Sequence, residues 1–330
     1  MIRSIAVVVP VLDDWASFAA LVADLARQFA GSEFAIRLYA IDDGSLAPFA
    51  AAALNLPPAS RIVSLDIIQL ALNLGHQRAI AVGLCAVADS PQCDAVVVMD
   101  GDGEDRPSDL AALLAASRDS PGAIVLARRA RRSEPWTFRV WYQLYRALFY
   151  ILTGQTIRFG NFSLLPIAAV RRLVYMPELW NHLAASIMRS RLPYREVAVA
   201  RGPRFAGRSH MNLVGLIVHG LSALSVHTDM IFVRVLLASA AIGVAAAFGI
   251  VAVAGVRFGT SLAIPGWATT AAGDLLIVLV QTLVVVVAAT LTMLAGRSNR
   301  PIVPILDARQ FIAERQTFDR ERLSASAMLP

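Results

Sequence analysis

The sequence predicts an α/β domain built on a mostly parallel, doubly wound sheet, followed by interfacial helices and two C-terminal transmembrane helices. Three observations support this fold class. Continuous apolar strands alternate with helical segments, as in parallel sheets that are buried on both faces. Polar loops follow several of these strands, and two long uncharged spans stand near the C-terminus. We therefore expect residues 1–210 to form one water-soluble domain ahead of the membrane segment.

The elements of this domain follow in order from their apolar runs. Parallel strands present their carboxyl ends at one edge of the sheet. Loops that begin at Pro10, Asp42 and Asp100 should therefore meet at that edge. We expect strands over 5–10, 34–42, about 61–70, the run just before Asp100, and 123–127. We expect one helix over 15–29, a second that ends at about residue 88, and a third that begins at about Pro107.

Two spans near the C-terminus are long enough to cross a bilayer. Residues 235–256 and 275–295 contain no charged side chain, and each exceeds the roughly 20 residues that a helix needs. A buried core helix is the alternative, but neither span has a polar face. We expect a juxtamembrane helix over 211–229, transmembrane helices at about 230–256 and 274–295, and a cytoplasmic tail over 297–330.

The distribution of arginine predicts the orientation in the membrane. The chain contains no lysine, and its arginines stand before the first span and after the second, whereas the connecting loop holds only Arg257. Both termini and the α/β domain are therefore expected in the cytoplasm, on the inner (plasma) membrane. The first ten residues lack the apolar core of a secretory leader. The net charge of +6 suits an anionic membrane surface, and no nucleic-acid partner is expected because no basic patch is interleaved with stacking aromatics.

Two further segments have the pattern of amphipathic helices. Residues 135–153 carry aromatics and leucines at helical spacing, which is typical of a helix in the membrane interface. A core helix is the alternative. Residues 211–227 have a similar pattern before the first span. Cys85 and Cys93 lack the spacing of metal ligands, so we expect packing roles and no disulfide.

A cluster of carboxylates follows the apolar strand in AVVVMDGDGEDRP. Asp100 and Asp102 stand two residues apart, and Glu104 follows two residues later. This spacing suits a loop that holds a hard divalent cation through oxygen ligands and leaves positions for substrate phosphates. The alternative is a solvated acidic turn in which Asp105 and Asp109 favour the N-terminus of the next helix.

Four segments together resemble a known family. PVLDDW, IDDGS, LNLGHQRAIAVGL and MDGDGEDRP, in this order, are similar to family 2 glycosyltransferases of the GT-A fold. The two C-terminal spans narrow the resemblance to polyisoprenyl-phosphate glycosyltransferases, a group that includes dolichol-phosphate mannose synthase and bactoprenol glucosyltransferases. The resemblance implies that Pro10, Asp14 and Asp43 contact the nucleotide of the donor. It also implies that Asp100 and Asp102 bind the donor through Mg²⁺ or Mn²⁺, with Glu104 as a third ligand. Asp43 could instead be the Asx residue of a turn, because DDGS is a strong turn sequence.

The resemblance further implies that arginines bind the acceptor phosphate. Arg128, just after the strand over 123–127, and Arg139, in the following helix, are the nearest matches, with Arg131 as another candidate. RFAGRSH resembles a loop in which a basic residue helps to close the site, and its candidates are Arg204, Arg208 and Ser209. A solvated basic loop is the alternative for any single arginine.

Two positions depart from the family pattern. Asn161 stands in RFGNFSLL, where many relatives have an acidic residue that is a proposed base, and Leu12 replaces a tyrosine. An alcohol acceptor needs its proton removed, whereas a phosphate monoester, with a second pKa near 6, is already largely dianionic at neutral pH. Asn161 therefore favours a phosphate acceptor. The candidate catalytic residues are Asp102, Arg128 and Asn161.

The sequence therefore predicts a metal-dependent, inverting transfer of a sugar from a nucleotide-sugar to polyprenyl phosphate. A UDP-sugar is favoured, with GDP-mannose as the other candidate donor, and a homo-oligomer, most simply a tetramer, is expected. Two alternatives remain open. One is a glycosyltransferase with a hydroxyl acceptor, although the QxxRW signature of processive synthases is incomplete because Ala147 replaces its tryptophan. The other is a catalytically inactive membrane scaffold.

Overall fold

The fold is that of a computed structural model. It describes residues 2–50, 54, 56–57, 59–90, 93–129, 136–156, 159–200, 202–205, 213–261, 264–321 and 323. The chain divides into two compact units, which we treat separately. The first lies within Met1–Tyr142, Thr156–Val226 and Ile302–Pro330, and the second within Gln143–Gln155 and His227–Pro301.

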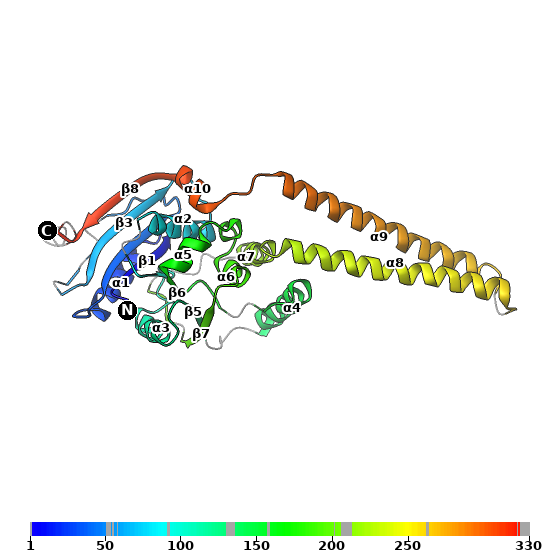
Figure 1. Ribbon diagram of the computed structural model, residues 1–330, viewed down its shortest axis with the longest axis horizontal. Helices are drawn as coiled ribbons and strands as arrows, with labels where there is room; N and C mark the ends of the chain where they lie inside the picture. The colour runs from blue at the N-terminus through cyan, green and yellow to red at the C-terminus, as the bar shows by residue number, and fades with distance from the viewer. Residues whose placement is uncertain are drawn as a thin grey trace. The chain divides into compact units, whose positions relative to one another are not determined.

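The first unit is built on an eight-stranded mixed sheet (Figure 1). Its order is β7-β5-β6-β4-β1-β2-β3-β8. Strand β1 pairs in parallel with β2 and β4, and β2 with β3, whereas β6 and β8 run antiparallel to their neighbours. The strands are β1 (Ser4–Val11), β2 (Ala35–Asp42), β3 (Ile62–Leu70), β4 (Ala95–Val98), β5 (Ile124–Arg129), β6 (Ser163–Pro166), β7 (Tyr194–Val199) and β8 (Ile312–Asp319).

Helices cover both faces of this sheet. Helices α1 (Trp15–Gln28) and α3 (Pro107–Asp119) share one core cluster with Ile5, Val7 and Val9 of β1. The opposite face packs against α2 (His76–Asp89), α5 (Ile167–Leu173), the short 3-10 helix η2 (Pro177–Trp180) and α6 (Leu183–Ser190). Alternate residues of β1 therefore enter opposite cores, which explains why this strand is apolar from Ile5 onward.

The expected fold class is confirmed: an α/β domain with a mostly parallel sheet precedes two long apolar helices. The strands and helices expected between residues 5 and 127 are all present. Sequence analysis did not foresee β6, β7 or the helices between them. The antiparallel β6 separates β4 from β5, so the loop before β6 comes to lie next to the end of β4.

The segment after the second apolar helix also belongs to the sheet. Helix α10 (Pro304–Asp307) and the 3-10 helix η3 (Ala308–Phe311) lead into β8, which pairs with the edge strand β3. The buried carboxylate of Asp66 accepts hydrogen bonds from Arg315 Nε at 3.0 Å and from Thr317 Oγ1 at 2.6 Å. The segment over 302–321 is thus structural, because it covers an edge that would otherwise expose unpaired backbone groups.

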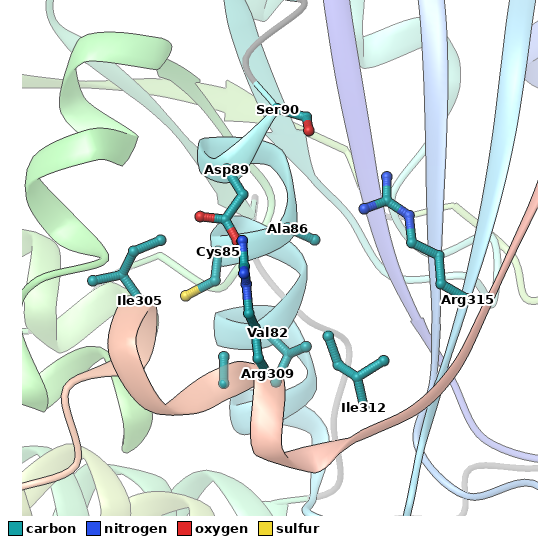
Figure 2. A pocket seen from close by; sticks show the side chains of 10 residues that line it. Val82, Cys85, Ala86, Asp89, Ser90, Ile305, Arg309, Ile312 and Arg315 are labelled. Atoms are coloured by element: carbon teal, nitrogen blue, oxygen red, sulfur yellow. Dashed lines mark hydrogen bonds and ion pairs between the residues drawn. The ribbon is translucent and has the colours of Figure 1, made fainter.

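A cavity of about 190 Å³ lies between α2 and this C-terminal segment (Figure 2). Its walls include Cys85 on α2 and Ile312 on β8, and the ion pair between Asp89 and Arg309 lies beside it at 3.0 Å. Both cysteines of the chain are free and buried, and burial raises the pKa of the Cys93 thiol to about 11. The packing roles expected for the two cysteines agree with this burial.

The second unit contains α8 (Thr228–Gly259), α9 (Trp267–Ser298) and the C-terminal half of α4 (Trp136–Thr153). Each of the two apolar helices has 32 residues, or about 48 Å at 1.5 Å per residue. Arg234 of α8 donates hydrogen bonds to the carbonyls of Tyr150 and Ile151, at the end of α4. A cation at a helix C-terminus satisfies carbonyls that lack helical partners, so Arg234 fixes the end of α4 within this unit.

Candidate active site

Three loops meet at the carboxyl edge of the sheet, around the end of β1. Strand β1 has β2 on one side and β4 on the other. The chain passes from β1 through β2 to β3 on one side and then crosses back to β4 on the other. In open α/β sheets, ligands bind outside the carboxyl ends of the strands at such a switch point. Asp42 ends β2 here, Asp43 directly follows it, and Asp100 follows β4. The edge that the sequence predicted as the site is therefore assembled from the expected loops.

The loops after β1 and β2 are tied to each other through Asp13 and Ser45. The backbone N–H of Asp13 donates to Ser45 Oγ at 2.9 Å, and Leu46 N–H donates to Asp13 Oδ1 at 2.7 Å. Asp13 has a φ of +50°, which few residues adopt without such bonds. Pro10 lies in β1, and Asp14 caps α1 by accepting a bond from Ser17 N–H at 3.3 Å. Asp14 thus has a structural role in addition to the donor contact predicted for it.

Asp43 holds the start of α2. Its carboxylate accepts hydrogen bonds from Leu74 N–H at 2.7 Å and Gly75 N–H at 2.9 Å. The carboxylate is buried, and desolvation raises its pKa although these two bonds lower it. The turn-forming side-chain bond considered for Asp43 is instead made by Asp42, whose Oδ1 accepts from the N–H of Ser45, three residues on, at 2.8 Å. Asp43 therefore positions the first residues of α2 against the loop after β2.

A chain of side-chain hydrogen bonds runs from a backbone amide to His76. Leu183 N–H donates to Gln77 Oε1 at 2.8 Å, Gln77 Nε2 donates to Asn161 Oδ1 at 3.0 Å, and Asn161 Nδ2 lies 2.9 Å from His76 Nε2. Because a backbone N–H can only donate, it fixes the orientation of Gln77, which in turn fixes that of Asn161. His76 Nε2 must then accept, so the neutral ring carries its proton on Nδ1.

The ring of His76 also faces the acidic loop. Its Nε2 lies 3.4 Å from Asp100 Oδ1. Desolvation lowers the pKa of His76, and the nearby carboxylates of Asp43, Asp105 and Asp102 offset part of this effect. A lowered pKa agrees with the neutral tautomer that the hydrogen-bond chain requires. His76 and Gln77 stand within LNLGHQRAI, and no role was predicted for them from the sequence. Two polar residues at the start of a helix that follows a strand were the available signal.

The acidic loop after β4 is held by its own backbone. Asp105 Oδ2 accepts from Asp100 N–H at 3.0 Å, and Asp102 Oδ1 accepts from Glu104 N–H at 2.9 Å. Gly103, with a φ of +91°, makes the turn between Asp102 and Glu104, a conformation that favours glycine. Asp105 is thus used inside the loop, together with one carboxylate oxygen of Asp102.

Arg204 lies over these two carboxylates. Its Nη2 is 2.7 Å from Asp102 Oδ2, and its Nε is 3.2 Å from Glu104 Oε1. Within the described part of the chain, no three Asp, Glu, His or Cys side chains converge in the geometry of a metal site. The carboxylates nevertheless fit Mg²⁺ or Mn²⁺ in chemistry, because both cations prefer hard oxygen ligands. A positive charge already lies between two of the three predicted ligands.

The predicted acceptor residues lie mostly outside the described residues. Arg128, at the end of β5, is half exposed, with its Nε 3.7 Å from Glu196 Oε2. Arg139 belongs to α4, but its side chain lies outside the described part, as do residues Arg131, Arg208 and Ser209. Asn161 is brought beside His76 and close to Asp100. The structure thus joins the donor and carboxylate residues at one edge and leaves the acceptor set untested.

An α/β domain with an Asp-Gly-Asp loop at the switch point of its sheet defines a glycosyltransferase of the GT-A type. The chain belongs to the family described as Glycosyl transferase family 2, whose profile matches residues 6–178. Members of this family transfer a sugar from a nucleotide-sugar donor.

Solved structures of one synthase agree with this fold. Glucosyl-3-phosphoglycerate synthase from Mycobacterium tuberculosis, in complex with Mn²⁺, UDP-glucose and phosphoglyceric acid, is 17% identical with a TM-score of 0.50, over 69% of this chain and 80% of that one. Mannosyl-3-phosphoglycerate synthase from Rubrobacter xylanophilus is 13% identical with a TM-score of 0.46, over 68% and 72%. Comparison with curated protein sequences gave no match.

Proposed function

We propose that this glycosyltransferase moves a sugar from a nucleotide-sugar to polyprenyl phosphate at the cytoplasmic face of the inner membrane. The observation that carries the proposal is the pair of long apolar helices joined to a family 2 domain. The described residues of α9 include no buried side chain, and α8 buries only Ser239 and Ala246. Apolar surface of this extent is rarely exposed to water. A lipid bilayer is the medium that suits both helices. A lipid acceptor in the same bilayer can then reach the enzyme without a carrier protein.

Helix α4 supports the same environment. In its described half, Leu144, Leu148, Tyr150 and Ile151 are exposed, and this half belongs to the same compact unit as α8 and α9. A helix with exposed leucines and tyrosines suits the boundary between headgroups and acyl chains. With both termini in the cytoplasm, as the arginine distribution indicates, α4 would lie at the cytoplasmic surface of the membrane.

The acidic loop is the proposed site of donor activation. Asp100, Asp102 and Glu104 would hold Mg²⁺ or Mn²⁺, which when bound neutralises charge on the departing nucleoside diphosphate. Asp43 and the loops containing Pro10 and Asp14 would bind the nucleotide. The Mycobacterium tuberculosis synthase of similar fold was solved with Mn²⁺ and UDP-glucose, so a UDP-sugar is the first donor to test, followed by GDP-mannose.

The acceptor is proposed from the chemistry around Asn161. Asn161 is committed to Gln77 and His76, and an amide cannot remove a proton from an alcohol. A phosphate oxygen needs no deprotonation: it forms a bond to the anomeric carbon as the bond from that carbon to the diphosphate breaks, and the electron pair leaves with the diphosphate. The single displacement inverts the anomeric configuration, and no proton is transferred.

Arginines would hold the acceptor phosphate during this displacement. Arg128 stands at the carboxyl end of β5, on the same edge of the sheet as the acidic loop. Arg139, Arg131, Arg208 and Ser209 complete the proposed set. Guanidinium groups bind phosphate with two parallel hydrogen bonds. Because two helices offer little surface for packing within the membrane, we also propose a homo-oligomer, most simply a tetramer, which the mass of the detergent-solubilised protein would test.

Transfer of radiolabelled sugar to polyprenyl phosphate in detergent tests the proposal. A panel of UDP- and GDP-sugars would be assayed with Mn²⁺ or EDTA, for the wild type and for Asp102→Asn. We expect label in the lipid phase from one donor, and this label should be lost with EDTA. The rate of transfer should fall at least 100-fold in the variant, because removing one electrostatic stabiliser of a transition state lowers the rate by about this factor. Protein that binds a nucleotide-sugar but labels no lipid would instead indicate a scaffold.

A further inference from the structure

Residues 202–205 lie along the acidic loop and are bonded to it. Gly202 N–H donates to the carbonyl of Glu104, and Phe205 N–H donates to the carbonyl of Asp102, both at 2.9 Å. The ring of Phe205 packs on Gly103, where a Cβ would lie within 2.6 Å of it. Arg204, between these two anchors, is therefore presented to the loop by its backbone. Its position does not depend on the side chain finding the carboxylates by itself.

The guanidinium of Arg204 occupies the place of a cation. It contacts one oxygen of Asp102 and one of Glu104, which are two of the three residues proposed to hold the metal. The side chain of Arg204 is only 28% exposed, and those of Asp102 and Glu104 are 16% and 10% exposed. Charges that are this shielded from solvent interact more strongly than surface pairs. The same contacts direct one oxygen of each carboxylate toward Arg204.

We propose that Arg204 is an internal counter-ion that must leave Asp102 and Glu104 before the divalent cation binds. The inference rests on the proposed metal-assisted function and adds a regulatory step to it. Arginine and cation compete for the same oxygens, so the metal binds weakly in the absence of donor. A donor diphosphate offers the displaced guanidinium a new bidentate partner. Metal and nucleotide then bind cooperatively, because each favours the state in which Arg204 has left the loop.

Arg106 provides a matched control. It carries the same charge next to the same loop, and its side chain packs on Gly202. Its guanidinium, however, is paired with Asp109 at 2.6 Å and 2.9 Å and contacts neither Asp102 nor Glu104. Removing Arg106 changes the local net charge by the same amount without freeing the proposed ligands. A comparison of the two variants therefore separates displacement from a general electrostatic effect.

Mn²⁺ binding to the full-length protein in detergent, followed by electron paramagnetic resonance of the free ion, tests the proposal with and without UDP. We expect Arg204→Met to bind Mn²⁺ at least tenfold more tightly than the wild type when UDP is absent. Arg106→Met should differ less than threefold from the wild type, and Arg204→Lys should stay close to it. UDP should tighten Mn²⁺ binding strongly in the wild type and much less in Arg204→Met.

The outcomes separate this inference from the function on which it rests. Unchanged or weaker Mn²⁺ binding by Arg204→Met, with a thermal unfolding midpoint like that of the wild type, would overturn the counter-ion role. Equal gains in Arg204→Met and Arg106→Met would overturn it as well, because general electrostatics would then suffice. If neither the wild type nor Arg204→Met binds Mn²⁺ even with UDP, the metal-assisted donor site itself is wrong.

Discussion

The attachment of β8 depends on a buried carboxylate, and two arginines allow this to be tested. Arg315 and Arg309 both connect the C-terminal segment to the α/β domain through an aspartate, each with an N–O distance of 3.0 Å. The side chain of Asp66, the partner of Arg315, is 6% exposed, whereas Asp89, the partner of Arg309, is 30% exposed. Replacing each arginine with methionine keeps most of the aliphatic stem and removes the charge.

The expected costs differ because of this burial. Arg315→Met leaves the carboxylate of Asp66 buried with Thr317 as its remaining side-chain donor. Losing one partner of an ion pair costs several kcal/mol of stability when both groups are buried. Because Arg315 is 40% exposed, we expect a smaller loss of stability, about 2 kcal/mol. Arg309 is 76% exposed, and loss of such a surface pair costs less than about 1 kcal/mol.

Hydrogen exchange of peptides from Ile312–Asp319, in the full-length protein, measures the local opening of β8. A cost of about 2 kcal/mol corresponds to exchange roughly 30-fold faster. We expect this for Arg315→Met and a change below about fivefold for Arg309→Met. Equal acceleration in both variants, or a larger effect of Arg309→Met, would refute the view that burial of the aspartate determines the strength of the attachment.

Three further predictions concern the acidic loop, the hydrogen-bond chain and the thiols. Gly103→Ala should lower the thermal unfolding midpoint more than Gly122→Ala, because both have positive φ but only the former Cβ meets an aromatic ring; equal shifts would count against that contact. Since the pKa of His76 is lowered, the folded state resists protonation and loses stability as pH falls below about 6.5. Asn161→Asp replaces a donor with an anion, so His76 should titrate at higher pH by nuclear magnetic resonance, and an unchanged titration would contradict the assigned chain. With its pKa of about 11, the Cys93 thiol should react with iodoacetamide at pH 8 far more slowly in the folded protein than in denaturant, and similar rates would contradict its burial.

The strands near the site could be predicted because their information is local. Strand β1 is apolar from Ile5 to Val11 since Val7 faces one core and Val8 the other. The motif at the end of β4 likewise stands in a continuous stretch of sequence, which placed Asp100 and Asp102 at the correct edge. Patterns of this kind depend only on residues that are neighbours in the chain.

The features that sequence analysis missed depend on residues far apart in the chain. Strand β8 pairs with β3 across some 250 positions, and its sequence, IAERQTFD, has no continuous apolar face to indicate a strand. Asn161 was considered as a lost base, but its bond to Gln77 and its approach to His76 connect positions 84 and 85 residues apart. The role of these side chains appears only in the folded chain, where β6 brings the loop that precedes β6 beside β4.

The choice of acceptor is the central claim, and a direct competition tests it. With the donor that the wild type uses and with Mn²⁺ present, polyprenyl phosphate and the matching polyprenol would be supplied at equal concentration, and the labelled products separated by charge. Because the amide of Asn161 cannot deprotonate an alcohol, we expect label only in the phosphate-linked product, with inverted anomeric configuration. Label in the polyprenol product would contradict the account, and so would a phosphate-linked product that retains the configuration of the donor.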